Sequence, residues 1–592
     1  MGKTFVEKIF NAPAGSIVFH QPDIVLSHDN TASIAKTFSQ MGGQNIKYPD
    51  RLLVVLDHNA PPTTTKLAND YQFIKNFVKQ QGIGKFHGEG EGICHQVMSY
   101  YAKPGMVIVG SDSHTSTAGA FNAFATGIDR TETAGIWLKG ETWFRVPESI
   151  KIVLEGKLSP GVYSKDLALW IIGMISSSGA NYQSVEFHGP GMETLTISDR
   201  MVLANLSAEM GAKNAVFPND DILQDFLQQD IKGTWSDPDA HYDQEIKINL
   251  ADVFPVVSAP HHVDNVKAVD QVKGTLINQA VIGTCTNGRI EDLRIAAEIL
   301  KDQQVDPDVL MVIIPASRKI FQQAAREGLL EIFSQAGATV MVPSCGPCLG
   351  TGQALPADNW NVISTANRNF LGRMGNPQAS IFLASPATVA RSAVKGKITP
   401  PPGTENQNSF PHTPPQSETV NIQSGDDRYN QGIWDYSDVD NLNTDQMFAG
   451  SLTYTIKSSE PETIIPHLFM GLDGSFASRL KSGDIILGGE NFGCGSSREH
   501  PSVGLAHAGV KAVIVKSVAR IFYRSAINQG LLVIVAPQAV QAYKPGIGID
   551  IDPLKGKITV GDQTIQIPPL PDKLKQIIDA GGLKKLLKNS GN

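Results

Sequence analysis

The sequence predicts an α/β fold with mostly parallel sheets, because short apolar runs alternate with helical stretches along the chain. Runs typical of buried strands lie at residues 52–56, 106–109, 280–282, 309–314 and 363–365. Helical stretches such as residues 289–300 follow several of these runs, and this alternation is the pattern of parallel sheets connected through helices. Several runs end in turns that contain Gly, Ser or Asn. Ligands usually bind at the carboxyl ends of parallel strands, so these turns are candidate site segments.

The length of 592 residues requires several domains, since a domain usually has about 100–200 residues. From about Ile398 to Asp440, prolines lie among Gln, Asn, Ser, Thr and Asp with almost no apolar periodicity, which predicts an extended linker. Beyond it, strand-like runs at residues 483–488, 512–515 and 531–535 surround a helical stretch at 501–508. We therefore expect a large body joined by a linker to a smaller carboxy-terminal domain.

The composition argues against a nucleic-acid or membrane protein. The chain has 50 Lys and Arg against 58 Asp and Glu, a formal charge of −8, so no overall positive field attracts nucleic acid or an anionic membrane. We find no apolar stretch of membrane-spanning length and no secretory signal at residues 1–10. Five cysteines in so long a chain argue against a disulfide framework and for a reducing compartment. We expect a soluble, cytoplasmic protein with metal or thiol chemistry.

Three cysteines are candidate metal ligands. Cys345 and Cys348 lie in Ser-Cys-Gly-Pro-Cys-Leu-Gly, and Cys285 lies in Ile-Gly-Thr-Cys-Thr-Asn-Gly at a predicted strand end. The Cys-x-x-Cys pair alone is compatible with a redox dithiol, half of a zinc site or two buried thiols. Three thiolates suit a cubane whose fourth iron has no protein thiol, whereas an electron-transfer ferredoxin normally uses four. For Cys94 we favour a buried apolar role, and Cys494 is interpreted as a loop residue.

Five motifs, in order along the chain, resemble the aconitase and isopropylmalate dehydratase superfamily. They are Gly-Ser-Asp-Ser-His-Thr at 110–115, Gly-Thr-Cys-Thr-Asn at 283–287, Cys-Gly-Pro-Cys at 345–348, Asn-Arg-Asn-Phe-Leu-Gly-Arg at 367–373 and Gly-Cys-Gly-Ser-Ser-Arg-Glu-His at 493–500. The resemblance implies a three-domain α/β/α body, a linker and a swivelling β/α domain that closes over the active site. The implied boundaries are 1–146, 147–266, 267–397 with the cysteines, 398–430 for the linker, and 431–592. Large and small subunits would then be fused, and no separate small subunit is required.

The same resemblance implies a [4Fe–4S] cluster and a set of catalytic residues. Cys285, Cys345 and Cys348 would bind the cluster, and the deprotonated oxygen of Ser496 would remove the proton beside a carboxylate. The family roles around the leaving hydroxyl and the iron-bound water fall on Asp57, His58, His95, Asp112, His114 and Glu209. Asn205 and Asn287 match asparagines near the cluster, and Asp445 matches a carboxylate of the swivelling domain. Substrate contacts are expected from His28, Ser113, Arg368, Arg373, Thr453 and Arg498.

The chemistry of such a dehydration explains these residue types. Removing a proton next to a carboxylate creates an aci-carboxylate dianion, which needs concentrated positive charge, and guanidinium groups such as Arg368 and Arg373 grip carboxylates with two hydrogen bonds. Loss of hydroxide needs an acid and a metal. A lone histidine near a strand end is usually structural, and a lone arginine is usually a solvated surface group. The Asp57–His58 and Asp112–Ser113–His114 pairings within motifs favour catalysis instead.

The substrate is predicted from the carboxy-terminal part. Residues 483–500 and 517–524 are closer to small subunits of isopropylmalate dehydratase and homoaconitase than to mitochondrial aconitase. Segment 449–455, Ala-Gly-Ser-Leu-Thr-Tyr-Thr, lies where aconitase and homoaconitase carry an additional arginine for a third carboxylate, and it has none. We therefore predict a 2-alkylmalate such as isopropylmalate. The alternatives are citrate or homocitrate as substrate, an RNA-binding regulator, which the acidic charge and Ser496 disfavour, and an electron-transfer protein, which the missing fourth cysteine disfavours.

Overall fold

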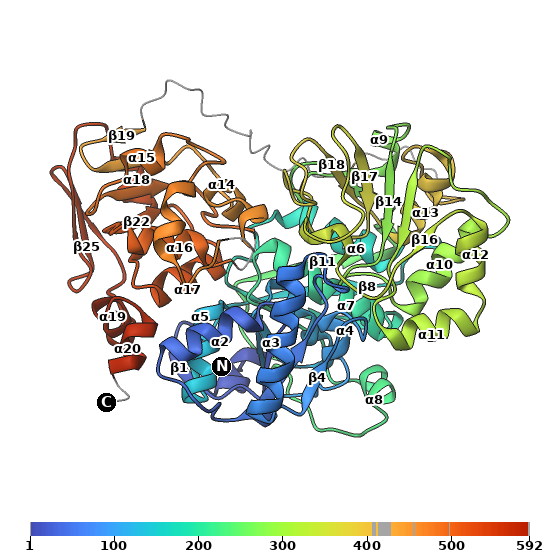
Figure 1. Ribbon diagram of the computed structural model, residues 1–592, viewed down its shortest axis with the longest axis horizontal. Helices are drawn as coiled ribbons and strands as arrows, with labels where there is room; N and C mark the ends of the chain where they lie inside the picture. Colours follow the sequence, from blue (N-terminus) through green and yellow to red (C-terminus); the bar gives the residue numbers. More distant parts are fainter. Residues whose placement is uncertain (1, 405–409, 412–427, 454–455, 496–497, 590–592) are drawn as a thin grey trace. The chain divides into compact units, whose positions relative to one another are not determined.

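The structure is a computed structural model that describes residues 2–404, 410–411, 428–453, 456–495 and 498–589 (Figure 1). It is mixed α/β with mostly parallel sheets, as the alternating pattern predicted. The chain divides into two compact units, which we describe in turn. Unit 1 comprises Met1–Ala32, Pro49–Gly127 and Trp143–Gln416, and unit 2 comprises Ser33–Tyr48, Ile128–Thr142 and Ser417–Asn592.

The first sheet of unit 1 has the order β4-β3-β2-β5-β6, and all its neighbours are parallel. Its strands are β2 (Ile24–Ser27), β3 (Leu52–Val55), β4 (Lys85–His87), β5 (Val107–Gly110) and β6 (Phe124–Gly127). Strands β2, β3, β5 and β6 are buried at every position, which explains their continuous apolar sequences. The chain leaves β2, β3 and β5 at one edge of the sheet through segments that begin at His28, Leu56 and Ser111. Acidic and histidine side chains distant in sequence therefore gather at this edge.

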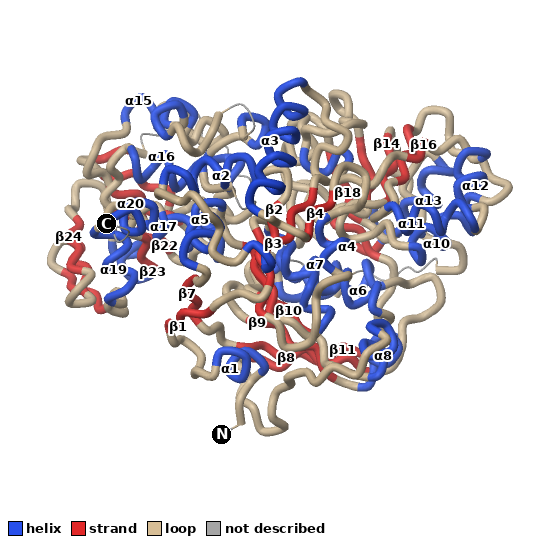
Figure 2. The backbone as a smooth tube through the Cα atoms, turned by 60° about the horizontal axis from the view of Figure 1, so that its bottom comes forward, coloured by secondary structure: helices blue, strands red, loops and turns tan. Residues whose placement is uncertain are grey.

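The second sheet of unit 1, in the order β10-β9-β8-β11, is also parallel, and Figure 2 shows its strands running together. The strands are β8 (Ser149–Glu155), β9 (Ser184–His188), β10 (Asn214–Val216) and β11 (Gln244–Asn249). Helix α6 (Ser164–Ile175) packs against α7 (Ile197–Leu206), and a 3-10 turn at Ser207–Met210 follows α7. Asn205 in the last turn of α7 and Glu209 in the 3-10 turn are thus held on rigid elements.

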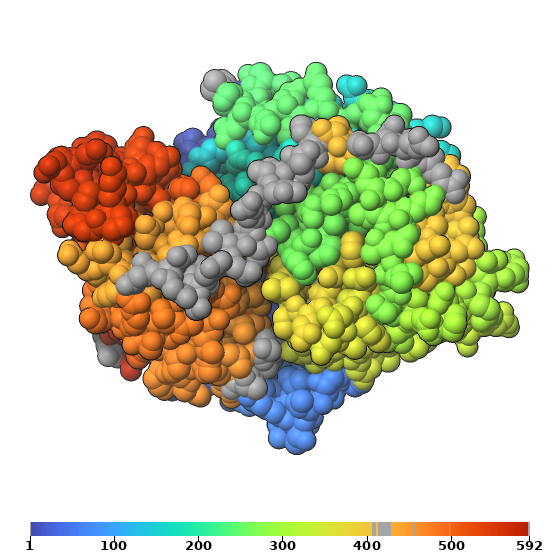
Figure 3. Space-filling model, turned by 90° about the horizontal axis from the view of Figure 1, so that it is seen from above, coloured from blue at the N-terminus to red at the C-terminus, as the bar shows by residue number. Residues whose placement is uncertain are grey.

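The third sheet of unit 1 carries the segments that contain the cysteines. Its order is β13-β12-β18-β17-β14-β15-β16, parallel from β18 to β16 and antiparallel at β12 and β13. The strands are β12 (Val256–Ser258), β13 (Val266–Ala268), β14 (Gln279–Ile282), β15 (Leu310–Ile313), β16 (Thr339–Val340), β17 (Asn361–Ser364) and β18 (Ser380–Leu383). The strand predictions at 280–282, 309–314 and 363–365 are confirmed as β14, β15 and β17. On the surface, the green segment around residues 250–280 adjoins the yellow segment around residues 360–380 (Figure 3). Beneath the surface, β12 pairs with β18.

Helices pack beside the third sheet of unit 1 (Figure 1). They are α10 (Ile290–Leu300), α11 (Arg318–Arg326), α12 (Leu329–Gln335) and α13 (Pro386–Lys395). Helix α10 packs against α13, and α13 packs against β14, so that apolar residues of the helices and the sheet share one core. The predicted helix at residues 289–300 is confirmed as α10.

Unit 2 contains a sheet in the order β19-β20-β21-β22-β23, which is parallel from β20 onward. Its strands are β19 (Tyr429–Asn430), β20 (Ile433–Tyr436), β21 (Ile485–Gly488), β22 (Ala512–Val515) and β23 (Val533–Val535), with helices α16 (His500–His507) and α17 (Arg520–Asn528). An antiparallel sheet, β24-β25-β26, follows as Ile549–Asp552, Lys557–Val560 and Gln563–Gln566. The strands and the helix predicted between residues 483 and 535 are confirmed.

The structure corrects part of the predicted linker. Ile398 is fully buried, and Phe410 is 7% exposed and packs edge-on against Trp170. Strands β19 and β20 lie within the stretch up to Asp440 that the sequence predicted to be an extended linker. They form because Trp434 and Tyr436 are fully buried in the core of unit 2. The sequence pattern missed these strands because β19 has two residues and β20 has four, and Asp435 interrupts the apolar residues of β20. Residues 405–409 and 412–427 of the expected linker lie outside the described residues.

No helix in the described part of the chain combines the length and the apolar character needed to cross a membrane.

A buried ion pair fixes α7 within unit 1. Arg200, which is fully buried, donates through Nη1 and Nη2 to the two carboxylate oxygens of Asp220 at 2.7 and 2.6 Å and to the carbonyl of Met192 at 3.2 Å. Asp220 is also the N-cap of α8 (Asp221–Leu227), where it accepts from the amide of Leu223. The pair therefore joins the middle of one helix to the start of another, and α7 is the helix that carries Asn205.

We expect Arg200→Met to destabilise unit 1 by about 3 kcal/mol, because it leaves the carboxylate of Asp220 without its cation in a mostly buried place. Chemical denaturation followed by circular dichroism measures this free energy of unfolding. Arg294→Met is the matched control, since Arg294 makes the same two-bond contact with Glu327 at 2.8 and 2.6 Å on an exposed surface. It should cost clearly less than Arg200→Met, because exposed ion pairs contribute little to stability. Equal losses in both variants would contradict the expected dependence on burial.

Candidate active site

The three predicted cysteine ligands are reduced and sheltered in unit 1. Cys285 follows β14, and Cys345 and Cys348 lie at the start of and within the 3-10 turn Gly346–Leu349. Burial, and then the charge of Cys348, raises the pKa of the Cys285 thiol to about 12. Burial also raises the pKa of Cys345 well above its usual value, and Cys285 and Cys348 add to this rise. The three sulfurs therefore act on one another electrostatically, and a bound cation is what would favour their thiolate form.

Hydrogen-bond donors point at two of these sulfurs. The side-chain amide nitrogens of Asn367 and Asn205 lie 3.1 and 3.4 Å from the Sγ of Cys285. Nη2 of Arg373 lies 3.4 Å from the Sγ of Cys348. Such N–H donors stabilise ligated sulfur and tune metal–sulfur clusters. Two buried thiols, the partly exposed thiol of Cys285 and the surrounding N–H donors fit a cluster held by three cysteines.

Two acidic residues link the histidines at the edge of the first sheet. Oδ1 of Asp57 lies 2.7 Å from Nδ1 of His58. Asp112 lies between two rings, with Oδ1 2.7 Å from Nε2 of His95 and Oδ2 3.5 Å from Nε2 of His58. Oδ1 of Asp112 also accepts from the backbone amide of His114 at 2.8 Å. The structure thus brings together the residues that the sequence placed in separate motifs.

A second chain of contacts begins at His114. Its Nε2 lies 2.6 Å from Oε1 of Glu209, and Nε of Arg368 donates to both Glu209 oxygens at 2.9 and 3.0 Å. One ligand-type atom from each of His95, His114 and Cys285 lies within 4.8 Å of the other two. His95 and His114 therefore approach Cys285 directly.

Burial and charge set the protonation of these groups. Burial lowers the pKa of His58, but the charges of Cys345 and Asp57 and hydrogen bonds to Asp112 and Asp57 outweigh it and raise this pKa well above its usual value. Burial raises the pKa of Asp112, yet the neighbouring His95 and His114 hold it well below its usual value. For Glu209, the charge of Arg368 and the contact with His114 overcome burial and lower the pKa to about 2. At neutral pH the two carboxylates are ionised and His58 carries a proton.

Two further predicted residues lie in the same place, and one residue was missed. The ring of His28 stacks on that of His58 with centroids 3.9 Å apart, and Ser113 is buried next to Asp112. Asp29, which the sequence analysis did not single out, accepts from the backbone amides of Asp57, His58 and Asn59 at 2.8–3.2 Å and from the hydroxyl of Tyr71 at 2.5 Å. The available signal was its position two residues after the apolar run at 24–27.

The predicted residues of unit 2 are described separately. Arg498 donates to both oxygens of Asp445 at 2.7 and 3.1 Å and to the carbonyl of Phe448 at 2.8 Å. Arg498 is therefore not the solvated surface arginine that an isolated arginine would suggest. Thr453 is half-buried. Ser496 lies outside the described residues.

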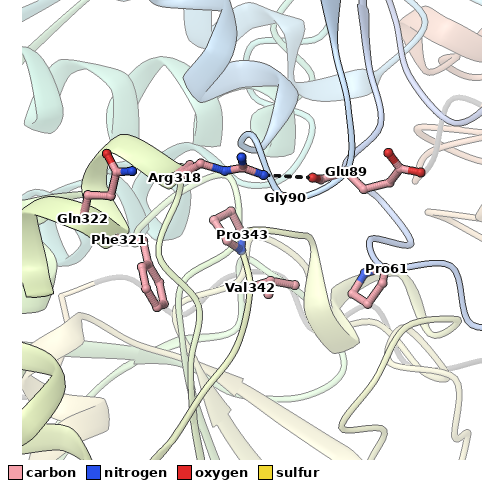
Figure 4. A pocket seen from close by; sticks show the side chains of 8 residues that line it. All are labelled: Pro61, Glu89, Gly90, Arg318, Phe321, Gln322, Val342 and Pro343. Carbon is pink, nitrogen blue, oxygen red and sulfur yellow. Dashed lines mark hydrogen bonds between the residues drawn. The ribbon is translucent and has the colours of Figure 1, made fainter. Parts of the chain in front are cut away.

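Two hollows lie in unit 1, near the segments that carry His58 and Cys345. The first has a volume of about 10 Å³, next to His58, Asn59, Ser344 and Gly346. The second, of about 420 Å³, is lined by Pro61, Glu89, Gly90, Arg318, Phe321, Gln322, Val342 and Pro343. Figure 4 shows Arg318 bonded to the backbone of Glu89, and its guanidinium also pairs with Glu91 at 3.0 Å. The second hollow contains none of the predicted site residues, so it is distinct from the candidate site.

Comparison with known proteins assigns the chain to a family. The model of the aconitase family (aconitate hydratase) matches residues 4–276 and 265–396, and that of the aconitase C-terminal domain matches residues 417–539. The 3-isopropylmalate dehydratase large subunit 2 of Archaeoglobus fulgidus is 45% identical over 413 residues, 68% of this chain and 99% of that protein. The probable methanogen homoaconitase large subunit of Methanosarcina mazei is 45% identical over 386 residues, 64% of this chain and 98% of that protein. This chain belongs to the aconitase family.

A solved structure of 3-isopropylmalate dehydratase (leuD) from Methanocaldococcus jannaschii is 39% identical and covers 26% of this chain and 89% of that chain, with a TM-score of 0.24. The resemblance found in the sequence is confirmed by the two family models. The roles of individual residues stay predictions.

We expect Asp29→Asn to lower kcat roughly 10- to 100-fold, because an amide group replaces an oxygen that accepts backbone N–H groups and shifts the segment that carries Asp57 and His58. Steady-state kinetics of the dehydration, with melting measured by circular dichroism, tests this. Asp199→Asn, which alters the exposed capping box of α7, is the control and should keep its activity. A wild-type kcat for Asp29→Asn would show that these backbone contacts do not position the site.

Proposed function

We propose that this chain is a hydro-lyase that reversibly dehydrates a 2-alkylmalate such as isopropylmalate, using a [4Fe–4S] cluster bound by Cys285, Cys345 and Cys348. The observation that carries the proposal is the contact network of Asp112, in which one carboxylate lies between two histidines, one of which, His95, approaches the thiol of Cys285. Membership of the aconitase family makes the chain an enzyme of the hydro-lyase class.

When bound, the cluster supplies an iron without a protein thiol, which acts as a Lewis acid on the leaving hydroxyl. The residues around it hold, orient and transfer protons. The raised pKa of His58 favours its protonated form, and Asp57 holds its Nδ1. Delivery of a proton to the leaving oxygen is therefore assigned to Nε2, which faces Oδ2 of Asp112 at 3.5 Å. Asp112 fixes the orientation of His58 and His95. These contacts support the acid role for His58.

Positive charge for the carboxylates comes from Arg368 and Arg373. Both are buried, at 4% and 9% exposure. Arg368 is oriented by Glu209 through Nε, and this leaves its terminal nitrogens for a substrate carboxylate. A guanidinium held in this way binds a carboxylate with two bonds and needs little reorganisation as charge develops.

Removal of the proton on carbon is assigned to Ser496 by its motif, Gly-Cys-Gly-Ser-Ser-Arg-Glu-His. Arg498, two residues later, is oriented by Asp445 within unit 2. A fixed cation near the serine would favour its alkoxide form. The base role of Ser496 stays a prediction.

The alkylmalate assignment depends on segment 449–455, which contains no arginine. Leu452 packs against the core of unit 2, and Thr453 is half-buried. A third carboxylate facing such side chains would be unpaired, which costs several kcal/mol. Relatives at 41–45% identity are named both 3-isopropylmalate dehydratase and homoaconitase. The absence of an arginine from segment 449–455 favours isopropylmalate over citrate or homocitrate as the substrate.

We also propose that residues 431–592 act as the swivelling domain and replace a separate small subunit. The match of the aconitase C-terminal domain within the same chain supports this. The body would divide at 1–146, 147–266 and 267–397, with a linker at 398–430, and the protein would work in the cytoplasm, where a reducing environment keeps the cysteines reduced.

We expect Cys345→Ser to abolish both cluster binding and activity, because serine cannot replace the third thiolate. Ser496→Ala should abolish turnover and leave the cluster intact. Anaerobic reconstitution followed by iron and sulfide analysis, visible absorption and a dehydration assay separates the two effects. Full turnover by Ser496→Ala would remove the assigned base. An RNA-binding regulator would instead keep its function in Cys345→Ser.

The reconstituted enzyme should convert alkylmalates at least about 10-fold faster, in kcat/KM, than citrate or homocitrate, since the unpaired third carboxylate costs more than 1.4 kcal/mol. A panel of hydroxy acids, assayed by the absorbance of the alkene product, measures this ratio. Faster turnover of citrate or homocitrate would refute the alkylmalate assignment and leave the hydro-lyase class in place.

A further inference from the structure

Lys165 is a buried cation that the mechanism above does not use. It lies at the second position of α6 and is fully buried. Its Nζ donates to the carbonyl oxygens of Thr365 at 2.8 Å and Ala366 at 2.6 Å. A buried ammonium group is costly unless it is hydrogen-bonded and close to negative charge. Two neutral carbonyls satisfy its hydrogen bonds but not its charge.

The two carbonyl groups belong to the segment that orients the cysteines. Thr365 and Ala366 connect β17 to Asn367, whose amide donates to the Sγ of Cys285. The carbonyl of Thr365 also accepts from Oγ1 of Thr286 at 2.5 Å. Oγ1 of Thr365 accepts from the amide of Gly283 at 2.9 Å and donates to its carbonyl at 3.0 Å. Lys165 therefore binds at the junction of the segments on either side of Cys285.

Acidic and thiol groups of the candidate active site act electrostatically on the ammonium group of Lys165. Burial lowers the pKa of Lys165 to about 7, while Cys285, Cys348, Asp292 and Glu209 act in the opposite direction. Of these groups, Asp292 bonds to Asn287 and to backbone amides, and Glu209 pairs with Arg368. At the sulfurs themselves, the side-chain amides of Asn367 and Asn205 donate to Cys285 and the guanidinium of Arg373 donates to Cys348. A charge on Lys165 would add to these contacts.

We propose that Lys165 is a positioning residue that places a positive charge beside the segments that flank Cys285 and favours the more reduced state of the cluster. The proposal rests on the cluster assignment of the proposed function. A fixed charge next to the ligands changes the reduction potential of an iron–sulfur cluster, and loss of such outer contacts typically lowers metal affinity about 10- to 100-fold. Lys165 also ties Asn367 and Arg368 to α6 through the segment before them.

Lys165→Met removes the charge and keeps the length of the side chain. Lys165→Gln removes the charge and retains a donor for one carbonyl. Lys213→Met is the matched control, because Lys213 is also fully buried but its Nζ lies 5.5 Å from the ring of Tyr182. The readouts are melting of the cluster-free chain, iron and sulfide content after anaerobic reconstitution, the midpoint potential of the cluster and the rate of iron loss to a chelator.

We expect both Lys165 variants to shift the midpoint potential to more negative values and to lose iron about 10-fold faster than wild type. Lys213→Met should lower the melting temperature and leave the potential unchanged. Lys165→Arg, which restores the charge, should return the potential toward the wild-type value. An unchanged potential in folded Lys165→Met and Lys165→Gln would overturn the proposal. So would failure of both to fold while Lys213→Met folds, since the role would then be structural only.

The same experiment separates this inference from the function on which it depends. If the wild-type chain takes up no cluster, the cofactor assignment fails, and Lys165 cannot affect a cluster potential. If the wild-type chain takes up a cluster and turns over an alkylmalate, but the Lys165 variants match Lys213→Met in every readout, only the role of Lys165 is wrong.

Discussion

The carboxylate of Asp112 is the contact on which the candidate site depends. It accepts from the ring of His95 and from the amide of His114 and faces the ring of His58. His58 follows β3, His95 lies in α4 (Cys94–Met98) after β4, and Asp112 and His114 follow β5. The parallel order β4-β3-β2-β5 brings these segments to one edge of the first sheet. A carboxylate at this position is stable only because surrounding N–H groups and a protonated histidine offset the cost of its burial.

Charge balance extends from this carboxylate through the rest of the unit 1 site. His114 connects Asp112 to Glu209, and Glu209 connects to Arg368. On the other side, the charge of Cys345 acts on His58. Each carboxylate of this network therefore has a basic neighbour that fixes its orientation. Such preorganisation lets an enzyme stabilise a developing dianion without first turning its own dipoles.

Much of the fold could be read from local patterns, and some of it could not. The strands β3, β5, β14, β15 and β17 are continuous apolar runs, and burial on both faces explains why these runs were recognisable. Strands β19 and β20 were missed because they are short and lie in a polar stretch, so that only the packing of Trp434 and Tyr436 in the core of unit 2 reveals them. Asp29 was missed because it binds backbone amides. Nearly every residue type has such an amide, so the residues that Asp29 contacts cannot be recognised from the sequence.

The sequence alone determined the chemistry that is available: three cysteines, paired acids and histidines, and two arginines in one motif. Residue types and short spacings are local properties, so they can be recognised without a fold. The tertiary structure alone decided which of these groups meet, that Glu209 joins His114 to Arg368, and that Lys165 reaches the segments beside Cys285. These contacts join residues up to about 200 positions apart, and only the packing of sheets and helices sets such distances.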